Sequence, residues 1–560
     1  MNQRSPIGKV GAPAPQEASA DEFYFWIAPD KLVEQTQLVV CDSTIAGQKI
    51  RFYGVIEEIR RTSRGKSMGA EIDAFDGDVD YEPPFASEGV TYARVAVLRA
   101  EPPYFTPPRE RSTGFLADEH DAKLAYRADE IRESQSLPVG LVRNGGDDSR
   151  HAGAGFIDLD YLLGTNGGHL NVNGAAGRGT KSSFLLWMNW LLLKKARDDA
   201  RARPSDSNRL HIVPIILNVK GFDLFSIDRK SRHYDETKHG TAWKNMGIAQ
   251  PAPFSGVSYF APQIKGGTGA VQTNGRNDVR PYSWSLKDVL EAGLFEYLFA
   301  ESDAFDANFA ALALDIQAFL TREKVHNDSR ISLVQDVSEG RPTTFKALLG
   351  WIQAEGDEHK AKFASHHSAT WRKMSRRLVK ILHEARGVLR AEGEGAPLDV
   401  VRGATCDPIV VDLNALAGEI ELQRFVVAAI LKQIIAARTG ENRVAGLRYI
   451  VTIDELNRFA PKGSRDPVTK LIELVASEMR SQGVILFGAQ QQASKVSEKV
   501  VENAALRVAG RSGPLELSTI AWRILSDAAK RKIENLGPGE KLVIQDNFRE
   551  PMHIQIPFPV

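Results

Sequence analysis

The sequence predicts an α/β fold in which a parallel-sheet core is preceded by a small β-barrel and interrupted by an inserted helical region. Three observations predict it: short β-branched strands near the start, apolar strands that alternate with helices later, and a helix-rich stretch between them. A chain of 560 residues exceeds the size that one hydrophobic core reaches, so we expect more than one domain.

The bulk composition is that of an ordinary globular protein, with 42% apolar and 25% charged residues. The formal net charge is zero, so any nucleic-acid surface must be a local patch. Cys41 and Cys406 lie in different segments and form no disulfide framework. The longest apolar run, 184–193, is too short to span a bilayer, and the start of the chain has no apolar signal core. We therefore expect a cytoplasmic protein without a membrane partner.

The barrel is predicted from three strands, at residues 37–41, 49–59 and 91–98, with a Gly-, Asp- and Pro-rich loop between the last two. Punctuation by Pro and Gly sets the other boundaries. The expected segments are a disordered lead-in (1–20), a β-barrel (21–100), a linker with one helix at 117–132 (101–155), the first part of the core (156–284), a helical insertion (285–400) and the second part of the core (401–560).

The stretch Leu170–Leu193 reads as a buried strand, a glycine-rich turn, a lysine with two serines, and an apolar helix. This layout is typical of a loop that cradles phosphate, because backbone N–H groups and a helix N-terminus face the anion. It predicts a P-loop NTPase core of RecA-like type, with Lys181 reaching the terminal phosphates and Ser182 holding Mg²⁺. The expected nucleotide-binding residues are Gly174, Gly177, Arg178, Gly179, Thr180, Lys181, Ser182 and Ser183.

The spacing of this loop is irregular. In the pattern G-x-x-x-x-G-K-[ST] a glycine precedes the lysine directly, whereas Thr180 stands there and Ala175 occupies the other usual glycine position. Threonine tolerates positive φ poorly. We therefore expect Gly177 and Gly179 to adopt the unusual backbone angles.

The strand 449–455 ends in two adjacent carboxylates, Asp454 and Glu455. Downstream of a phosphate loop, the first carboxylate is expected to contribute to the Mg²⁺ shell and the second to orient and deprotonate the attacking water. The alternative is a strand end that merely carries solvated acids.

The next strand, 483–490, ends at Gln490, which is the candidate contact for the γ-phosphate or the attacking water. Gln491 and Gln492 are weaker candidates. Arg480 precedes this strand and is expected to act in the site of a neighbouring subunit, where an arginine stabilises the transferring phosphoryl group. Surface arginines before strands are also common without any such role; Arg507 and Arg511 are the alternatives for it.

A basic stretch lies on the predicted helix at 375–389 and just before it, at Arg372, Lys373, Arg376, Arg377 and Lys380. Such a stretch is more often a solvated helix face than a nucleic-acid contact.

Together these segments resemble the HerA branch of the HerA/FtsK family of ring-forming ATPases, over roughly residues 25–560. The resemblance rests on the order of several pieces. They are the β-barrel, the loop 174–183, the strand ending Asn218-Val219-Lys220-Gly221, the helical insertion, Ile453-Asp454-Glu455, Arg480 with Gly483, Ala489-Gln490, and a tail at 535–540 that is similar to the family's final hairpin. Two positions depart from it: Thr180 replaces a usual glycine, and Asn218 replaces a common aspartate.

The resemblance implies a homo-hexameric ring that uses ATP and Mg²⁺ to move duplex DNA through a central channel. It also implies a partner, either a NurA-like nuclease in DNA-end processing or a nuclease or sirtuin-like effector in anti-phage defence, with the barrel mediating assembly and docking. Two alternatives stay open: a nucleotide-binding ring scaffold that organises an effector enzyme with little hydrolysis, and an ATPase that moves a protein substrate.

Overall fold

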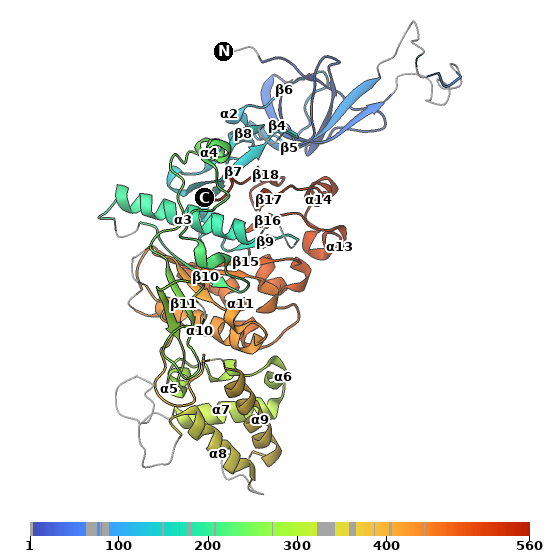
Figure 1. Ribbon diagram of the computed structural model, residues 1–560. Helices are drawn as coiled ribbons and strands as arrows, with labels where there is room; N and C mark the ends of the chain where they lie inside the picture. Colours follow the sequence, from blue (N-terminus) through green and yellow to red (C-terminus); the bar gives the residue numbers. More distant parts are fainter. Residues whose placement is uncertain are drawn as a thin grey trace. The chain divides into compact units, whose positions relative to one another are not determined.

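The computed structural model describes the chain apart from residues 1–3, 63–75, 79, 81–88, 148–149, 165, 176–180, 207–208, 272, 322–341, 358–365, 386, 403–405 and 442. Two compact units emerge, and both are discontinuous in sequence. The first contains Met1–Leu159, His233–Pro251 and Leu506–Pro559; the second contains Asp160–Arg232, Ala252–Ala505 and Val560. Figure 1 labels many of their helices and strands.

The first unit contains a closed six-stranded barrel with strand order β1-β2-β5-β4-β3-β6, which confirms the predicted N-terminal β-barrel. Aromatic and β-branched side chains fill its interior, among them Phe23, Phe25, Phe52 and Val95. The strands are β1 (Gly8–Val10), β2 (Glu22–Ile27), β3 (Leu38–Ile45), β4 (Gln48–Thr62), β5 (Val90–Glu101) and β6 (Thr113–Leu116).

The barrel is longer in sequence than predicted. Strand β1 lies inside the expected lead-in 1–20 and pairs with both β2 and β6. Strand β6 lies inside the expected linker 101–155. Both strands are short and contain glycine, so neither gives the period-2 apolar pattern by which the other barrel strands are found.

The rest of the first unit is built on an antiparallel sheet with order β16-β17-β18-β7-β8. Its strands β7 and β8 also lie in the expected linker, as does helix α2, which is shorter than the helix predicted at 117–132. The elements are α2 (Glu119–Ala125), β7 (Ser136–Arg143), β8 (His151–Asp158), α4 (Glu236–Asn245), β16 (Leu506–Ala509), α13 (Pro514–Leu517), α14 (Asp527–Glu534), β17 (Glu540–Gln545) and β18 (Met552–Gln555).

Glycines made β7 and β8 resemble a linker, although the sheet requires them. A Cβ on Gly140 of β7 would lie 2.7 Å from Cδ1 of Ile554, and a Cβ on Gly155 of β8 would lie 2.7 Å from Sδ of Met552. Both neighbours belong to β18, so the glycines allow that strand to approach closely.

The second unit is built on a parallel sheet with order β12-β11-β13-β10-β14-β15-β9. This confirms the predicted α/β core. The strands are buried and rich in Val and Ile, as is typical of parallel sheets covered on both faces. They are β9 (Leu170–Asn173), β10 (His211–Asn218), β11 (Ser258–Pro262), β12 (Val279–Tyr282), β13 (Ile409–Asp412), β14 (Leu447–Asp454) and β15 (Val484–Gln490).

Alternate residues of β10 show which helices cover each face of this sheet. Ile216 packs in a cluster with Leu193 of α3 (Ser182–Ala202). Its neighbours Ile215 and Leu217 pack in the larger cluster, which also contains apolar residues of α10 (Ile420–Thr439) and α11 (Pro467–Glu478). Because successive strand residues point to opposite faces, α3 lies on one side of the sheet and α10 and α11 on the other.

The predicted helical insertion packs around buried aromatic side chains such as Phe309, Phe345 and Trp371. Its helices are α5 (Leu286–Glu291), α6 (Glu301–Ala304), α7 (Ala307–Leu320), α8 (Phe345–Asp357) and α9 (Ser368–Glu384). The short helix α12 (Glu498–Glu502) also belongs to the second unit. No helix among the described residues is long and apolar enough to cross a membrane.

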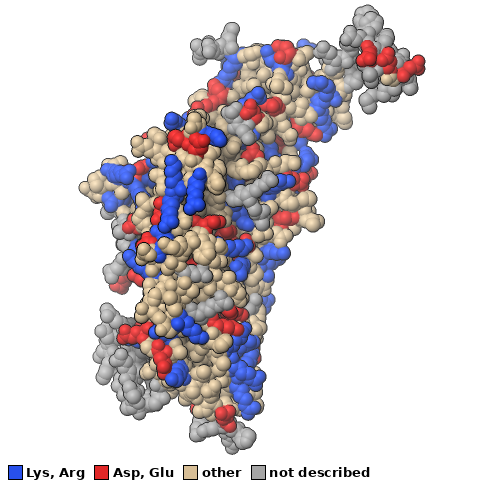
Figure 2. Space-filling view, viewed as in Figure 1, with Lys and Arg blue, Asp and Glu red and all other residues tan. Residues whose placement is uncertain are grey.

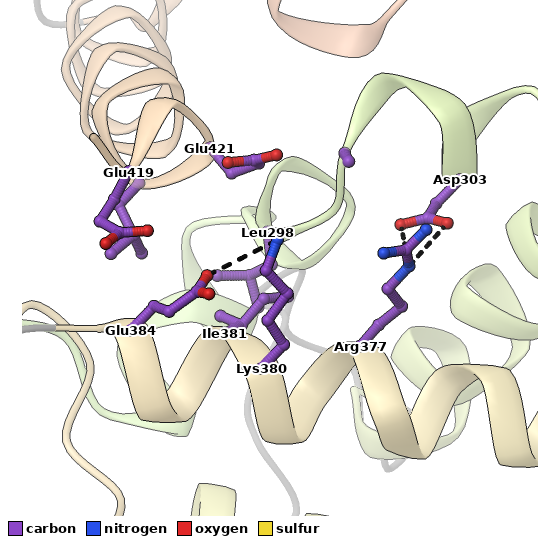
Figure 3. A pocket seen from close by; sticks show the side chains of 10 residues that line it. Leu298, Asp303, Arg377, Lys380, Ile381, Glu384, Glu419 and Glu421 are labelled. Carbon is purple, nitrogen blue, oxygen red and sulfur yellow. Dashed lines mark hydrogen bonds and ion pairs between the residues drawn. The ribbon is translucent and has the colours of Figure 1, made fainter.

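Helix α9 carries the basic stretch, and Figure 2 shows basic side chains gathered on this part of the molecule. Most of these cations are already paired. Lys373 contacts Asp303. Arg377 also contacts Asp303, and Lys380 lies 3.8 Å from Glu384, as Figure 3 shows. This pairing favours the interpretation of α9 as an ordinary helix face.

Candidate active site

The carboxyl ends of the parallel strands place the candidate residues at one edge of the sheet. Register aligns Asn173 of β9 with Gln490 of β15, and Asp454 of β14 with Ala489 beside it. One strand therefore separates the strand that enters the loop from the strand that ends in the two carboxylates. Parallel α/β sheets bind ligands at this edge.

Lys181 and Ser182 lie at the start of α3, where Lys181 is the residue that caps the helix. The Ser182 hydroxyl donates a hydrogen bond to Oδ2 of Asp454 at 2.5 Å. Ser183 follows, half-buried, in the first turn. Positive partial charge at the helix N-terminus and a hydroxyl beside a carboxylate are what a phosphate with its cation requires.

The other residues expected to cradle phosphate are only partly described. The Gly174 N–H donates to the Gln490 carbonyl at 3.3 Å, which holds the start of the loop against β15. Gly177, Arg178, Gly179 and Thr180 lie outside the described residues. The expected backbone angles of Gly177 and Gly179 therefore stay a prediction.

Glu455 lies at the centre of the site and has a left-handed backbone, with φ of 60°. Its Oε1 accepts a hydrogen bond from Lys220 Nζ at 2.8 Å and one from Gln491 Nε2 at 3.2 Å. Lys181 Nζ lies 3.7 Å from the same oxygen. Burial alone would raise the pKa of Glu455, but the hydrogen bonds from Lys220 and Gln491 and the charge of Lys181 outweigh it, so the pKa is lowered.

Gln490 is completely buried, and the hydrogen bonds of its side-chain amide go to β9. Its Nε2 donates to Oδ1 of Asn171 and to Oδ1 of Asn173, both at 2.6 Å, and Asn173 in turn donates to Asn171. The neighbouring Gln491, which we judged the weaker candidate, is the residue that contacts Glu455.

Asn218 and Asp412 form a buried pair next to this site, at the ends of β10 and β13. The Asn218 amide donates to Oδ1 of Asp412 at 2.8 Å and to the Gly221 carbonyl at 2.9 Å. Burial raises the pKa of Asp412 to about 6, although the Asn218 amide and two backbone N–H groups oppose it. An aspartate at position 218 would place two carboxylates in contact, where their charges would repel. The amide of Asn218 instead donates a hydrogen bond to the carboxylate of Asp412.

Arg480 lies at the opposite edge of the sheet. It is exposed and precedes β15, whose seven residues rise about 20 Å before they reach Gln490. A Cβ on Gly168 would lie 3.2 Å from Cβ of Arg480, so the backbone before β9 packs on the arginine stem. Arg480 is therefore far from Lys181 and Glu455 of its own chain. Of the two alternatives, Arg507 is half-buried in β16 and Arg511 is exposed, both in the other unit.

The site can be tested for its fit to Mg²⁺ and a nucleotide. Mg²⁺ takes oxygen ligands and keeps several waters, so one hydroxyl, one carboxylate and phosphate oxygens suffice. The contact between Ser182 and Asp454 provides the first two at a helix N-terminus. No group of three or more His, Cys, Asp or Glu side chains arranged for a metal occurs among the described residues. The residues fit a cation that arrives with its phosphates.

Sequence reasoning missed the contact between Lys220 and Glu455 and the pairing of Asn218 with Asp412. Lys220 stood within one of the segments that carry the resemblance, but nothing in the sequence pairs the end of β10 with the end of β14. Parallel order supplies that signal, because β10 lies directly beside β14. Any polar residue just after an apolar strand is a candidate for the same edge.

No protein-family model matches the chain, and no curated protein sequence matches it significantly. Similar solved structures include VirB4 of Thermoanaerobacter pseudethanolicus, which is 16% identical over 76% of this chain and 98% of that chain, with a TM-score of 0.46. The unbound bacterial conjugative coupling protein TrwB is 12% identical over 79% and 92%, with a TM-score of 0.44. The plasmid coupling protein TrwB in complex with ADP and Mg²⁺ is 13% identical over 70% and 86%, with a TM-score of 0.39. At such low identity these similarities transfer no residue role, and the functional inference rests on the contacts within this chain.

Proposed function

We propose that this chain is an ATPase that hydrolyses ATP with Mg²⁺ and belongs to a ring-forming DNA translocase or helicase of HerA type. One observation carries the proposal: Lys181 and Ser182, at the start of α3, lie directly beside Asp454 and Glu455, at the end of β14. A helix N-terminus, a lysine, a hydroxyl and two carboxylates at one sheet edge are the parts that phosphoryl transfer to water requires.

In this proposal each residue has a distinct role. Lys181 reaches the terminal phosphates, and Ser182 with Asp454 would hold Mg²⁺, which supplies charge neutralisation at the transferring phosphoryl group. Glu455, a carboxylate that is ionised at neutral pH, accepts a proton from the attacking water. Gln491 orients the Glu455 carboxylate. Lys181 cannot pair fully with both the Glu455 carboxylate and a phosphate. Binding of a phosphate would therefore rearrange the contact between Lys181 and Glu455.

The position of Arg480 supports an assembly of several subunits. An exposed arginine about 20 Å from its own site serves catalysis only if another subunit presents it, as a ring of identical subunits does. We infer a homo-hexamer that encircles duplex DNA in the cytoplasm, with the barrel mediating assembly and docking. Its partner is a NurA-like nuclease or a sirtuin-like effector, in DNA-end processing or anti-phage defence. The resemblance of the sequence supports this part of the proposal.

The test is ATP turnover with Mg²⁺, with and without duplex DNA. We expect DNA to stimulate turnover, and Lys181→Ala and Glu455→Gln to abolish it, with Glu455→Gln still binding ATP. The mass in solution should be that of a hexamer. For the trans role, Arg480→Ala subunits mixed with Lys181→Ala subunits should recover activity, because each mutant lacks a part that the other supplies. Turnover that neither substitution reduces would rule out this site.

One observation favours the scaffold alternative. The side-chain amide of Gln490, the expected contact for the attacking water, donates its hydrogen bonds to Asn171 and Asn173. A ring that binds ATP and organises an effector, with little hydrolysis, would need no residue in that role. ATP binding with hexamer formation and DNA-independent, near-zero turnover would decide for the scaffold.

A further inference from the structure

Lys220 lies outside the phosphate loop, on the turn that follows β10, and its ammonium group reaches across to β14. Its Nζ donates to Oε1 of Glu455 at 2.8 Å, closer than the 3.7 Å from Lys181 Nζ to the same oxygen. The Lys220 side chain is 58% exposed, whereas that of Glu455 is 10% exposed. Within the described part of the chain, Glu455 is the ion-pair partner of Lys220.

The turn that carries Lys220 is held from both sides. Asn218 donates to the Gly221 carbonyl at 2.9 Å, and the Gly221 N–H donates to Oδ1 of Asn414 at 3.1 Å. The buried carboxylate of Asp412 accepts hydrogen bonds from the Asn218 amide and from the Asn414 N–H. It therefore fixes both of the asparagines that hold Gly221. Gly221 has φ of +61°, a conformation that glycine adopts without strain. A lysine on a clamped turn reaches a defined position, whereas a lysine on a mobile loop does not.

Charge balance gives this contact a specific consequence. Two lysines share one buried carboxylate in the structure, and the proposed function requires Lys181 to contact the terminal phosphates instead. Lys220 is then the cation left beside Glu455. Without a cation beside it the carboxylate of Glu455 would be free to rotate, and a carboxylate that is not held in place activates the attacking water poorly.

We propose that Lys220 is a positioning residue that holds the carboxylate of Glu455 in its orientation while Lys181 binds the phosphates. This inference rests on the proposed function and adds to it a residue on the turn that follows β10. Lys220 acts through Glu455 and contacts no reacting atom itself.

The first experiment compares kcat and KM for ATP in the wild-type protein and in Lys220→Met, which keeps most of the stem and removes the charge. We expect kcat to fall about tenfold or more with little change in KM, because a carboxylate that is no longer held in place activates the water poorly while the phosphates are still bound. Lys220→Arg should restore much of kcat. Lys499→Met, which removes an exposed lysine 3.3 Å from Glu473, is the matched control and should leave kcat and KM unchanged.

The second experiment needs no turnover. Melting temperatures of Lys220→Met, Glu455→Gln and the double variant form a cycle. We expect Lys220→Met to lower the melting temperature in the wild-type background and to have little effect when residue 455 is already neutral. Equal effects in both backgrounds would overturn the inference, since the two side chains would then not interact.

The outcomes separate the two proposals. If the wild-type protein hydrolyses ATP but Lys220→Met keeps the wild-type kcat, the positioning role is wrong and the proposed function stands, even where the melting cycle shows coupling. If the wild-type protein does not hydrolyse ATP, both the proposed function and this role fail. A lowered kcat at unchanged KM, rescue by arginine and a non-additive cycle together support the inference.

Discussion

Replacing Asn218 by aspartate tests how the buried pair beside the site is balanced. Asn218 and Asp412 are both completely buried, and the Asn218 amide donates two hydrogen bonds, one of them to the Asp412 carboxylate. Losing a bond to a charged group costs about 1.5–3 kcal/mol and losing a neutral one about 1 kcal/mol, so removal of the amide should cost about 3 kcal/mol of unfolding free energy. At pH 8 a second ionised carboxylate, introduced at position 218, adds like-charge repulsion of about 1–2 kcal/mol.

The sign of the pH effect follows from Asp412. Burial raises its pKa to about 6 from the ordinary value of 3.8, so the stability that its proton supplies is present at low pH and is lost as the pH rises toward 6. With two carboxylates in contact, this loss extends to higher pH. Asn218→Asp should therefore be less stable than Asn218→Ala at pH 8 and more stable at pH 5, where a shared proton restores one hydrogen bond.

The assay is urea unfolding at both pH values, followed by tryptophan fluorescence. Trp284 is buried in the same core, beside Tyr282, whose hydroxyl donates to the Asp412 carbonyl at 2.6 Å. Asn218→Ala is the control because it removes the amide without adding a charge. Parallel pH dependence in the two variants would refute the reasoning.

Three further predictions concern other residues. Gln490→Ala should lower the unfolding free energy by about 2–4 kcal/mol, since it leaves two buried asparagine oxygens with fewer donors. This variant should still bind ATP in a calorimetric titration. Gln491→Ala should instead lower kcat without loss of stability. Gly140→Ala should destabilise the first unit by about 1–3 kcal/mol because its Cβ would meet Ile554 at 2.7 Å. Gly114→Ala, whose Cβ would lie 3.8 Å from its nearest neighbour, is the control and should have little effect on thermal unfolding. Equal losses of stability in the two variants would contradict this prediction. Burial and the neighbouring Glu57 raise the pKa of Glu550 to about 7 from 4.5, so the first unit should lose stability as the pH rises from about 4.5 to 7, and Glu550→Gln should abolish that dependence in melting curves.

The core and its edge could be predicted because their signals are local. An apolar run that ends in Asp454-Glu455, and another that leads through glycines to Lys181-Ser182, each specify a strand and its carboxyl end. The antiparallel strands β7 and β8 could not, because Gly140 and Gly155 are there for the approach of β18, which lies about 400 residues later in the sequence.

The exact contacts at the edge were beyond sequence reasoning for a related reason. Gln490 and Gln491 differ by one position, and one position reverses the side of a strand on which a side chain lies. The register of β15 on β9 aligns Gln490 with Asn173. Only this register decides that the Gln490 side chain bonds to the asparagines of β9 and the Gln491 side chain bonds to Glu455.

The measurement that tests the central claim most directly is ATP turnover by the purified protein with Mg²⁺, with and without duplex DNA, for the wild-type protein and Glu455→Gln. We predict turnover that rises on addition of DNA and falls about a thousandfold or more in the variant, which still binds ATP. Turnover that is equal in the two proteins, or absent from the wild-type protein on DNA, would contradict the assignment of Lys181, Ser182, Asp454 and Glu455 as one catalytic site.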